Sequence, residues 1–322
     1  MKRLSIVLLC LLLVSGALFA TGGSESTAKY PTKNITMICP WAAGGGTDAI
    51  LRALSAAAEK QLGVTITVEN RTGGAGAIGH SAIKNARPDG YTMGMVTLEL
   101  NSLPQQGLID YDYTAYDHVI RVNADAATIT VKSDSPINSI KDFLEHCKKN
   151  PGMLNMGISA PGSPWHIAAA LLANETGINY KYITFDGAAP AVTALAGGHI
   201  DAVSVSLPEI KSQLDAGNVK CLAIMDDKRS EGYPKIPTLK EEGYNIVYGA
   251  WRGISLPKGV DPAIQETIVK AFTEAMKDPA FINQAKNLNL ALAYQPPDEF
   301  NRFLKENFDA ITKTMKAIGL IK

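Results

Sequence analysis

The sequence has little of what several common chemistries require. It contains four cysteines in 322 residues without a Cys-x-x-Cys pair, and its five scattered histidines form no His-Glu-x-x-His pattern, so we predict no metal site. Basic and acidic residues number 31 each, which gives a formal net charge of zero and indicates no nucleic-acid partner. No motif predicts a cofactor. The composition therefore points away from metal, redox and nucleic-acid chemistry.

Long apolar runs are also missing, except at the start of the chain. Lys2 and Arg3 precede the apolar run 4–13, and small residues follow it up to Ala20. This pattern predicts a secretory signal peptide over residues 1–20, followed by a polar linker over 21–29, because the run is too short for a membrane-spanning helix. The mature protein is thus expected outside the cytoplasm, with three cysteines and at most one disulfide.

After the linker, strand-like and helix-like segments alternate in two series. In the first series, residues 35–38 and 64–69 are typical of strands and flank a helical pattern over 47–63, and a similar series spans about 154–225. This alternation predicts two doubly wound α/β domains with mostly parallel sheets. Extended stretches at 119–136 and 244–257 suggest two crossings that form a hinge. We expect the following parts: domain 1 over residues 30–126 plus 250–295, domain 2 over 127–249, and a C-terminal helix over 296–322 that packs across the domains.

Three consecutive glycines stand between the first strand and its helix. Gly44, Gly45 and Gly46 precede Thr47 and Asp48. Glycines let a backbone approach a bound group closely, and the first N–H groups of a helix have no intrahelical partner, so this turn suits an anion. A phosphate-binding P-loop is excluded because no lysine follows. An ordinary tight turn, with Thr47 or Asp48 as the helix cap, remains an open alternative.

A second glycine-rich stretch, residues 74–79, matches Gly-x-Gly-x-x-Gly. A dinucleotide site needs that motif directly after its strand and an acidic residue about 20 positions later. Residues 70–73 intervene here, and Asp89 and Glu99 are out of register. We therefore expect no dinucleotide.

The second series has two comparable turns, at 159–166 and 185–190. Small residues and hydroxyls lead into a helix in the first turn, and Pro190 suits a first helical turn in the second. Three such turns, divided between two domains, predict a cleft that closes on a small anion.

Several motifs in a fixed order resemble one family. They include PWAAGGGTD (40–48), VENRTGGAGAIG (68–79), SAPGSPWHIAA (159–169) and ITFDGAAPAVTALAGGHIDAVSVSLPEI (183–210). The chain resembles the Bug-type periplasmic solute receptors of tripartite tricarboxylate transporters from about Tyr30 to its end. The resemblance implies a non-enzymatic, monomeric two-domain receptor of the Venus flytrap type, which binds a dicarboxylate, tricarboxylate, acidic amino acid or aromatic acid and delivers it to membrane permease subunits.

The resemblance and the turns together give a predicted ligand site. The family's gripping loops correspond to 41–48, 162–166 and 187–190, and Thr97 and Ser204 are expected to add two further hydroxyls. The predicted residues are Trp41, Ala43, Gly44, Gly45, Thr47, Asp48, Thr97, Gly162, Ser163, His166, Gly187, Ala188, Ala189, Pro190 and Ser204. Arg71 and Arg252 are left open as pocket residues, and the carboxylate itself is not identified.

Membrane attachment and the class of function both leave alternatives open. Many related receptors carry a lipid-anchored cysteine where Thr21 stands, so we expect a protein free in the periplasm rather than tethered. Ser163 and His166 lie one helical turn apart, which leaves an exported hydrolase of small acids as the second hypothesis. A ligand sensor for a membrane signalling partner is the third.

Overall fold

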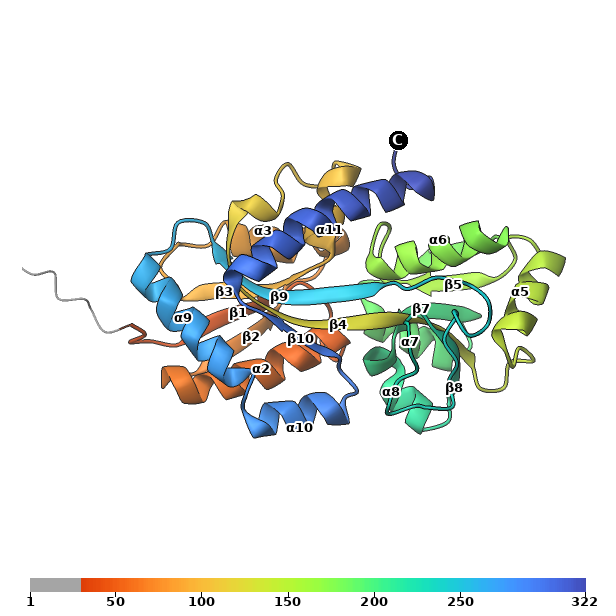
Figure 1. The fold of residues 1–322 in the computed structure, drawn as a ribbon, viewed down its shortest axis with the longest axis horizontal. Coiled ribbons are helices and arrows are strands. Elements are labelled where there is room, and N and C mark those ends of the chain that lie inside the picture. Colours follow the sequence, from red (N-terminus) through yellow and green to blue (C-terminus); the bar gives the residue numbers. More distant parts are fainter. Residues whose placement is uncertain (1–29) are drawn as a thin grey trace, which may run out of the picture. The chain divides into compact units, whose positions relative to one another are not determined.

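The computed structural model describes residues 30–322, and the expected signal peptide and linker lie outside them. Residues 33–322 form one compact unit. Its strands belong to one ten-stranded sheet, in which eight strands follow the order β2-β1-β3-β9-β4-β7-β5-β6, while β8 and β10 pair with β4 (Figure 1).

The first part of this unit, which we call lobe 1, begins with three parallel strands. These are β1 (Ile35–Cys39), β2 (Ile66–Asn70) and β3 (Thr92–Thr97). Helix α2 (Gly46–Leu62) ends at Gly63, whose positive φ of 69° closes the helix as the sequence predicts. The remaining helical segments are α3 (Ala77–Lys84), α4 (Glu99–Ser102), η1 (Gly74–Gly76), η2 (Pro104–Gln106) and η3 (Tyr113–Ala115).

Lobe 2 repeats the same construction. Its strands β5 (Asn155–Ile158), β6 (Lys181–Thr184) and β7 (Ala202–Ser206) are parallel, and β8 (Val219–Ile224) lies beside β4. Its helices are α5 (Ile140–Lys149), α6 (Pro164–Thr176), α7 (Ala188–Ala196) and α8 (Leu207–Asp215).

Two long strands connect the lobes. Strand β4 (Tyr116–Lys132) pairs with β9 (Gly249–Pro257) up to Ala126 and with β7 from Ala127 onwards (Figure 1). These pairings are antiparallel, so the expectation of mostly parallel sheets is right for β1–β3 and β5–β7 but incomplete. The reason is that β4 and β9 run in opposite directions as they pass between the lobes. We retain 126/127 and 249/250 as proposed domain boundaries.

The C-terminal segment returns to lobe 1. It contains α9 (Pro262–Ala275), α10 (Pro279–Asn287), β10 (Leu292–Gln295), which pairs with β4, and α11 (Pro297–Ala317). Pro262 and Pro297 are first helical residues, as predicted. Four buried side chains of α11, Phe300, Leu304, Ile311 and Met315, belong to a hydrophobic cluster that consists mainly of lobe 1 residues and also contains Ile167 of α6. Helix α11 thus packs on lobe 1, and its packing across both domains stays a prediction.

The three cysteines within residues 30–322 form no disulfide. Cys39, Cys147 and Cys221 are free, and burial raises the pKa of Cys39 and Cys147 to about 11. Thiols so hard to ionise are poor nucleophiles and poor metal ligands. They behave as the small buried hydrophobes that the sequence predicts.

Candidate ligand-binding site

A small cavity lies where the two lobes meet. From lobe 1 it is lined by the loop and first turn 41–47 together with Thr97 and Glu99, from lobe 2 by the starts of α6, α7 and α8, and from β9 by residues 250–252. Its volume is about 20 Å³, enough for about one water molecule. The lobes therefore touch across the site, and a larger ligand requires them to separate.

The beginnings of three helices meet at this cavity. Gly46 and Thr47 of α2, Pro164 and Trp165 of α6, and Ala188 of α7 all line it. Helices α2 and α7 have no side chain that caps their first N–H groups among the described residues. Each helix start carries about half a positive charge, and the first N–H groups of α2 and α7 are uncapped, so together they favour a negatively charged group.

The loop before α2 is held by Asp48. Its carboxylate accepts hydrogen bonds from the Gly44 amide at 3.0 Å, from Arg52 Nε at 3.0 Å and from Asn70 Nδ2 at 2.9 Å. Burial alone would raise the pKa of Asp48, but these donors outweigh it and the pKa is lowered. Asn70 Nδ2 also donates to the Trp41 carbonyl at 2.8 Å. Asp48 is therefore an anchor of the loop.

Several amides that we expected to bind the ligand already donate hydrogen bonds within the protein. The Gly44 amide is bonded to Asp48, that of Gly45 reaches the Ala42 carbonyl at 3.4 Å, and that of Gly162 donates to His166 Nδ1 at 3.0 Å. In this conformation turn and cap contacts satisfy these three donors, so a role in binding would require them to be released. Other residues at the helix starts that line the cavity are Gly46, Thr47, Trp165 and Ala188.

The predicted site residues fall into three groups. Six of them line the cavity: Trp41, Gly45, Thr47, Thr97, Gly187 and Ala188. Pro190 lines a neighbouring cavity of about 450 Å³ that shares Trp41 and Ser159 with the first. The other eight line neither cavity: Ala43, Gly44, Asp48, Gly162, Ser163, His166, Ala189 and Ser204. The roles of all fifteen remain predictions.

Ser163 and His166 do not form a catalytic pair. Ser163 Oγ accepts from the His166 backbone amide at 3.2 Å, as a helix cap, while the His166 ring accepts from the Gly162 amide. Burial lowers the pKa of His166 to about 4. A nucleophile needs a base within reach of its hydroxyl, and here the ring is bonded elsewhere. The geometry gives the hydrolase hypothesis no support.

The Gly-x-Gly-x-x-Gly stretch packs closely against Pro40 and Trp41. A Cβ at Gly79 would lie 2.5 Å from Pro40 Cα, and one at Gly76 would lie 3.1 Å from Trp41 Cζ2. Only glycine permits so close an approach. The motif therefore serves packing behind the loop 41–47, and residues 73, 75 and 76 also line the neighbouring cavity.

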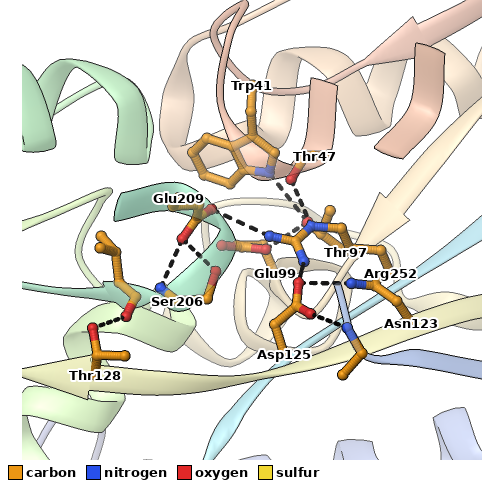
Figure 2. A network of polar contacts seen from close by, with 12 residues as sticks. Trp41, Thr47, Thr97, Glu99, Asn123, Asp125, Thr128, Ser206, Glu209 and Arg252 are labelled. Atoms are coloured by element: carbon orange, nitrogen blue, oxygen red, sulfur yellow. Dashed lines mark hydrogen bonds and ion pairs between the residues drawn. The ribbon is translucent and has the colours of Figure 1, made fainter. Parts of the chain in front are cut away.

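A hydrogen-bonded chain runs from Trp41 into lobe 1 (Figure 2). Trp41 Nε1 donates to Thr97 Oγ1 at 3.3 Å, and Thr97 Oγ1 donates to Glu99 Oε2 at 2.5 Å. Behind it, the Thr97 amide donates to His80 Nε2 at 3.3 Å, and burial lowers the pKa of His80 to about 4. The chain fixes one wall of the cavity.

Arg252 joins three segments beside the cavity (Figure 2). Its Nε donates to Thr47 Oγ1 at 2.8 Å, its Nη1 to Asp125 Oδ2 at 2.6 Å, and its Nη2 to Glu209 Oε1 at 3.2 Å. Arg71 instead pairs with exposed Glu69 and does not line the cavity. Of the two arginines left open, the structure brings only Arg252 to the site, with its charge already paired.

Glu99 and Glu209 are cavity residues that the sequence analysis did not select. Glu209 had a local signal, since Ser206 and Glu209 form a capping box at the start of α8. Glu99 had a weaker one, as it follows the end of β3 by two residues. Neither pattern by itself distinguishes a cap or a surface acid from a pocket residue.

Comparison with known proteins agrees with this architecture. Residues 50–320 match the family model described as "Tripartite tricarboxylate transporter family receptor". The chain belongs to this receptor family. It is 29% identical to protein BugT of Bordetella pertussis over 96% of this chain and 97% of BugT. The family and fold class expected from the sequence are thereby confirmed.

Two solved structures are similar to this chain over nearly their whole length. The periplasmic binding protein BugD shares 29% identity with a TM-score of 0.87, covering 91% of this chain and all of BugD. Rpa4515 of R. palustris, solved with adipate, shares 24% identity with a TM-score of 0.86 over 90% of this chain and 98% of its own. The fold is that of a periplasmic binding protein.

Two kinds of feature are absent from the described residues. Among residues 30–322, no helix combines the length and apolar character that a membrane crossing requires. Within the same range, no group of three or more His, Cys, Asp or Glu side chains is suited to a metal ion.

Proposed function

We propose that this receptor binds a small carboxylate-bearing solute in the cavity between its lobes, outside the cytoplasm, and delivers it to a membrane permease without catalysing a reaction. The observation that carries the proposal is the meeting of the first turns of α2, α6 and α7 at one cavity. The uncapped N–H groups of α2 and α7 and the partial positive charges of all three helix starts recognise a carboxylate without a free basic side chain.

Two further features support the proposal. The chain belongs to a family of tripartite tricarboxylate transporter receptors, and Rpa4515, a protein of similar fold, was solved with a dicarboxylate. The cavity has room for about one water molecule, so the lobes must part to admit a solute and close around it. Such closure is the usual motion of periplasmic binding proteins.

The test is a binding panel measured by thermal shift and calorimetry. The panel contains dicarboxylates, tricarboxylates, acidic amino acids and aromatic acids, each beside its primary amide. A true ligand stabilises the protein by about 2.7 kcal/mol at 100 times its dissociation constant, and its amide does not. Equal binding of the amides, or turnover of any panel member, would contradict the proposal.

A further inference from the structure

Acidic side chains outnumber basic ones around the cavity. Its ionisable lining residues are Glu99, Glu209 and Arg252, and Asp125 contacts the same guanidinium. Glu99, Asp125 and Arg252 are at most 3% exposed, and the side chain of Glu209 is 4% exposed. One cation thus stands among three carboxyl groups, in a place where water cannot screen them.

Two of the three carboxylates already accept several hydrogen bonds within the protein. Asp125 accepts from Arg252 Nη1, Asn123 Nδ2 and the Ala291 amide. Glu209 accepts from Arg252 Nη2 and from both the amide and the hydroxyl of Ser206. Each carboxylate therefore has three donors, one of them charged, and both act as structural partners of Arg252.

Glu99 differs from these two (Figure 2). Besides its own backbone amide, its one hydrogen-bond donor is the Thr97 hydroxyl, and it forms no ion pair within residues 30–322. Its side chain lines the cavity although the residue is only 3% exposed. Burial raises the pKa of Glu99 to about 7, against the weaker opposing effects of Thr97 and Arg252. A buried acid without a cationic partner is unfavourable unless something else supplies the charge.

Aromatic rings surround the same space. Trp41, Trp165 and Trp251 all line the cavity. The indole N–H of Trp41 donates to Thr97, and that of Trp251 donates to Asn307 Oδ1 at 2.8 Å. These two N–H groups are therefore already bonded within the protein. Indole rings attract cations through their quadrupole, so three tryptophans at the cavity are a second feature that suits a positively charged group.

We propose that the solute carries a cationic nitrogen beside its carboxylate, as in an amino acid, and that Glu99 is the residue that selects it. This inference rests on the proposed function, since the helix starts take the carboxylate. Glu99 then receives the ammonium group as its missing partner, in a charge-assisted hydrogen bond within a desolvated site. A solute that lacks the nitrogen leaves Glu99 unpaired and places its own negative charge beside excess acid.

The experiment compares matched acids that differ only in the amino group. Calorimetry at pH 8 measures L-aspartate against succinate, L-glutamate against glutarate, and L-leucine against 4-methylpentanoate. For the pair that fits the cavity, we expect the amino acid to bind at least about tenfold more tightly, as a hydrogen bond to a charged group predicts. In Glu99→Gln, which keeps the size and removes the charge, that ratio should fall to about one. Glu274→Gln, on the exposed face of α9, is the matched control and should keep the wild-type ratio.

The outcomes separate this inference from the proposed function. If the acids without an amino group bind as tightly as the amino acids, the inference is wrong while the carboxylate receptor stands. If no acid of either kind binds, the proposed function fails as well. If Glu99→Gln preserves the preference, the nitrogen is recognised by another group. The wild-type comparison needs no variant and decides the ligand class even if Glu99→Gln folds poorly.

Discussion

Thr97 is the residue that couples Trp41 to Glu99. Its hydroxyl accepts from the indole N–H and donates to the carboxyl group, and it is 3% exposed. In Thr97→Val, a variant of nearly equal volume, both buried partners lose a hydrogen bond. We expect a loss of about 1–3 kcal/mol in the free energy of unfolding, measured by urea denaturation. The matched change Thr267→Val, at a partly exposed position of α9, should alter it by less than about 0.5 kcal/mol. Equal midpoints for the two variants would mean that the contact is unimportant.

Glu99 also predicts how stability depends on pH. Its pKa in the folded protein is about 7, above the ordinary 4.5, so the folded state holds the proton more tightly than the unfolded state. This contribution is complete below pH 4.5 and is lost as the pH rises through 7. The charged groups that act on Glu99 are Arg252 and Glu209, and burial together with the Glu99 charge raises the pKa of Tyr248.

The measurement is the free energy of unfolding of the wild type minus that of Glu99→Gln, at pH 5, 6, 7 and 8. We expect the difference to fall by up to about 3 kcal/mol between pH 5 and 8. The buried His80, His118 and His166 have lowered pKa values and change stability in the opposite direction, but they are common to both proteins and cancel. A difference that is constant with pH would show that Glu99 is not perturbed.

At the residue scale, the sequence predicts which residues have a structural role better than it predicts which groups they contact. The anchoring role of Asp48 follows from its place in the first turn of α2, and the structure adds Gly44, Arg52 and Asn70 as its partners. The neutralisation of Arg252 by Asp125 depends on a contact across 127 positions. No local pattern contains that information, so the pairing of Arg252 and the isolation of Glu99 required the fold.

Among the elements, the start of α7 provides the sharpest test of the binding mode. Ala188 is the first residue of this helix and lines the cavity. Proline is well tolerated at a first helical position, where it removes one N–H group without breaking the helix. We expect Ala188→Pro to weaken carboxylate binding about tenfold or more while Ala188→Ser, which keeps the N–H group, stays close to the wild type. Calorimetry with the ligand found in the panel measures both, and equal affinities would remove α7 from the site.

The elements themselves were largely predictable because their signals are local. Alternating strands and helices, Gly63 after α2, and proline at the starts of α9 and α11 all follow from short-range preferences. The antiparallel pairing of β4 with β9 was not predictable in this way, since it joins residues more than 120 positions apart. The hydrogen bonds that the Gly44, Gly45 and Gly162 amides form within the protein were missed for a different reason. A glycine turn shows that donors can be exposed, but not that a neighbouring side chain or carbonyl has taken them.

For the whole molecule, contact between the lobes is the property that binding depends on. A Cβ at Gly46 of α2 would lie 3.0 Å from Glu209 Cγ of α8 and 3.3 Å from Arg252 Nη2. Gly46→Val therefore holds the lobes apart. We expect a loss of affinity of tenfold or more and a smaller decrease in the radius of gyration when ligand is added, measured by small-angle X-ray scattering. Ala56→Val, on the exposed face of the same helix, should behave as the wild type. Unchanged compaction in Gly46→Val would show that this contact does not limit closure.

The narrowness of the cavity has a kinetic consequence. A solute can enter only while the lobes are parted, so capture proceeds no faster than the opening motion, however abundant the solute becomes. The observed association rate should then level off at high concentration instead of rising in proportion. Because three tryptophans line the space, their fluorescence in a rapid-mixing experiment would record this ceiling directly.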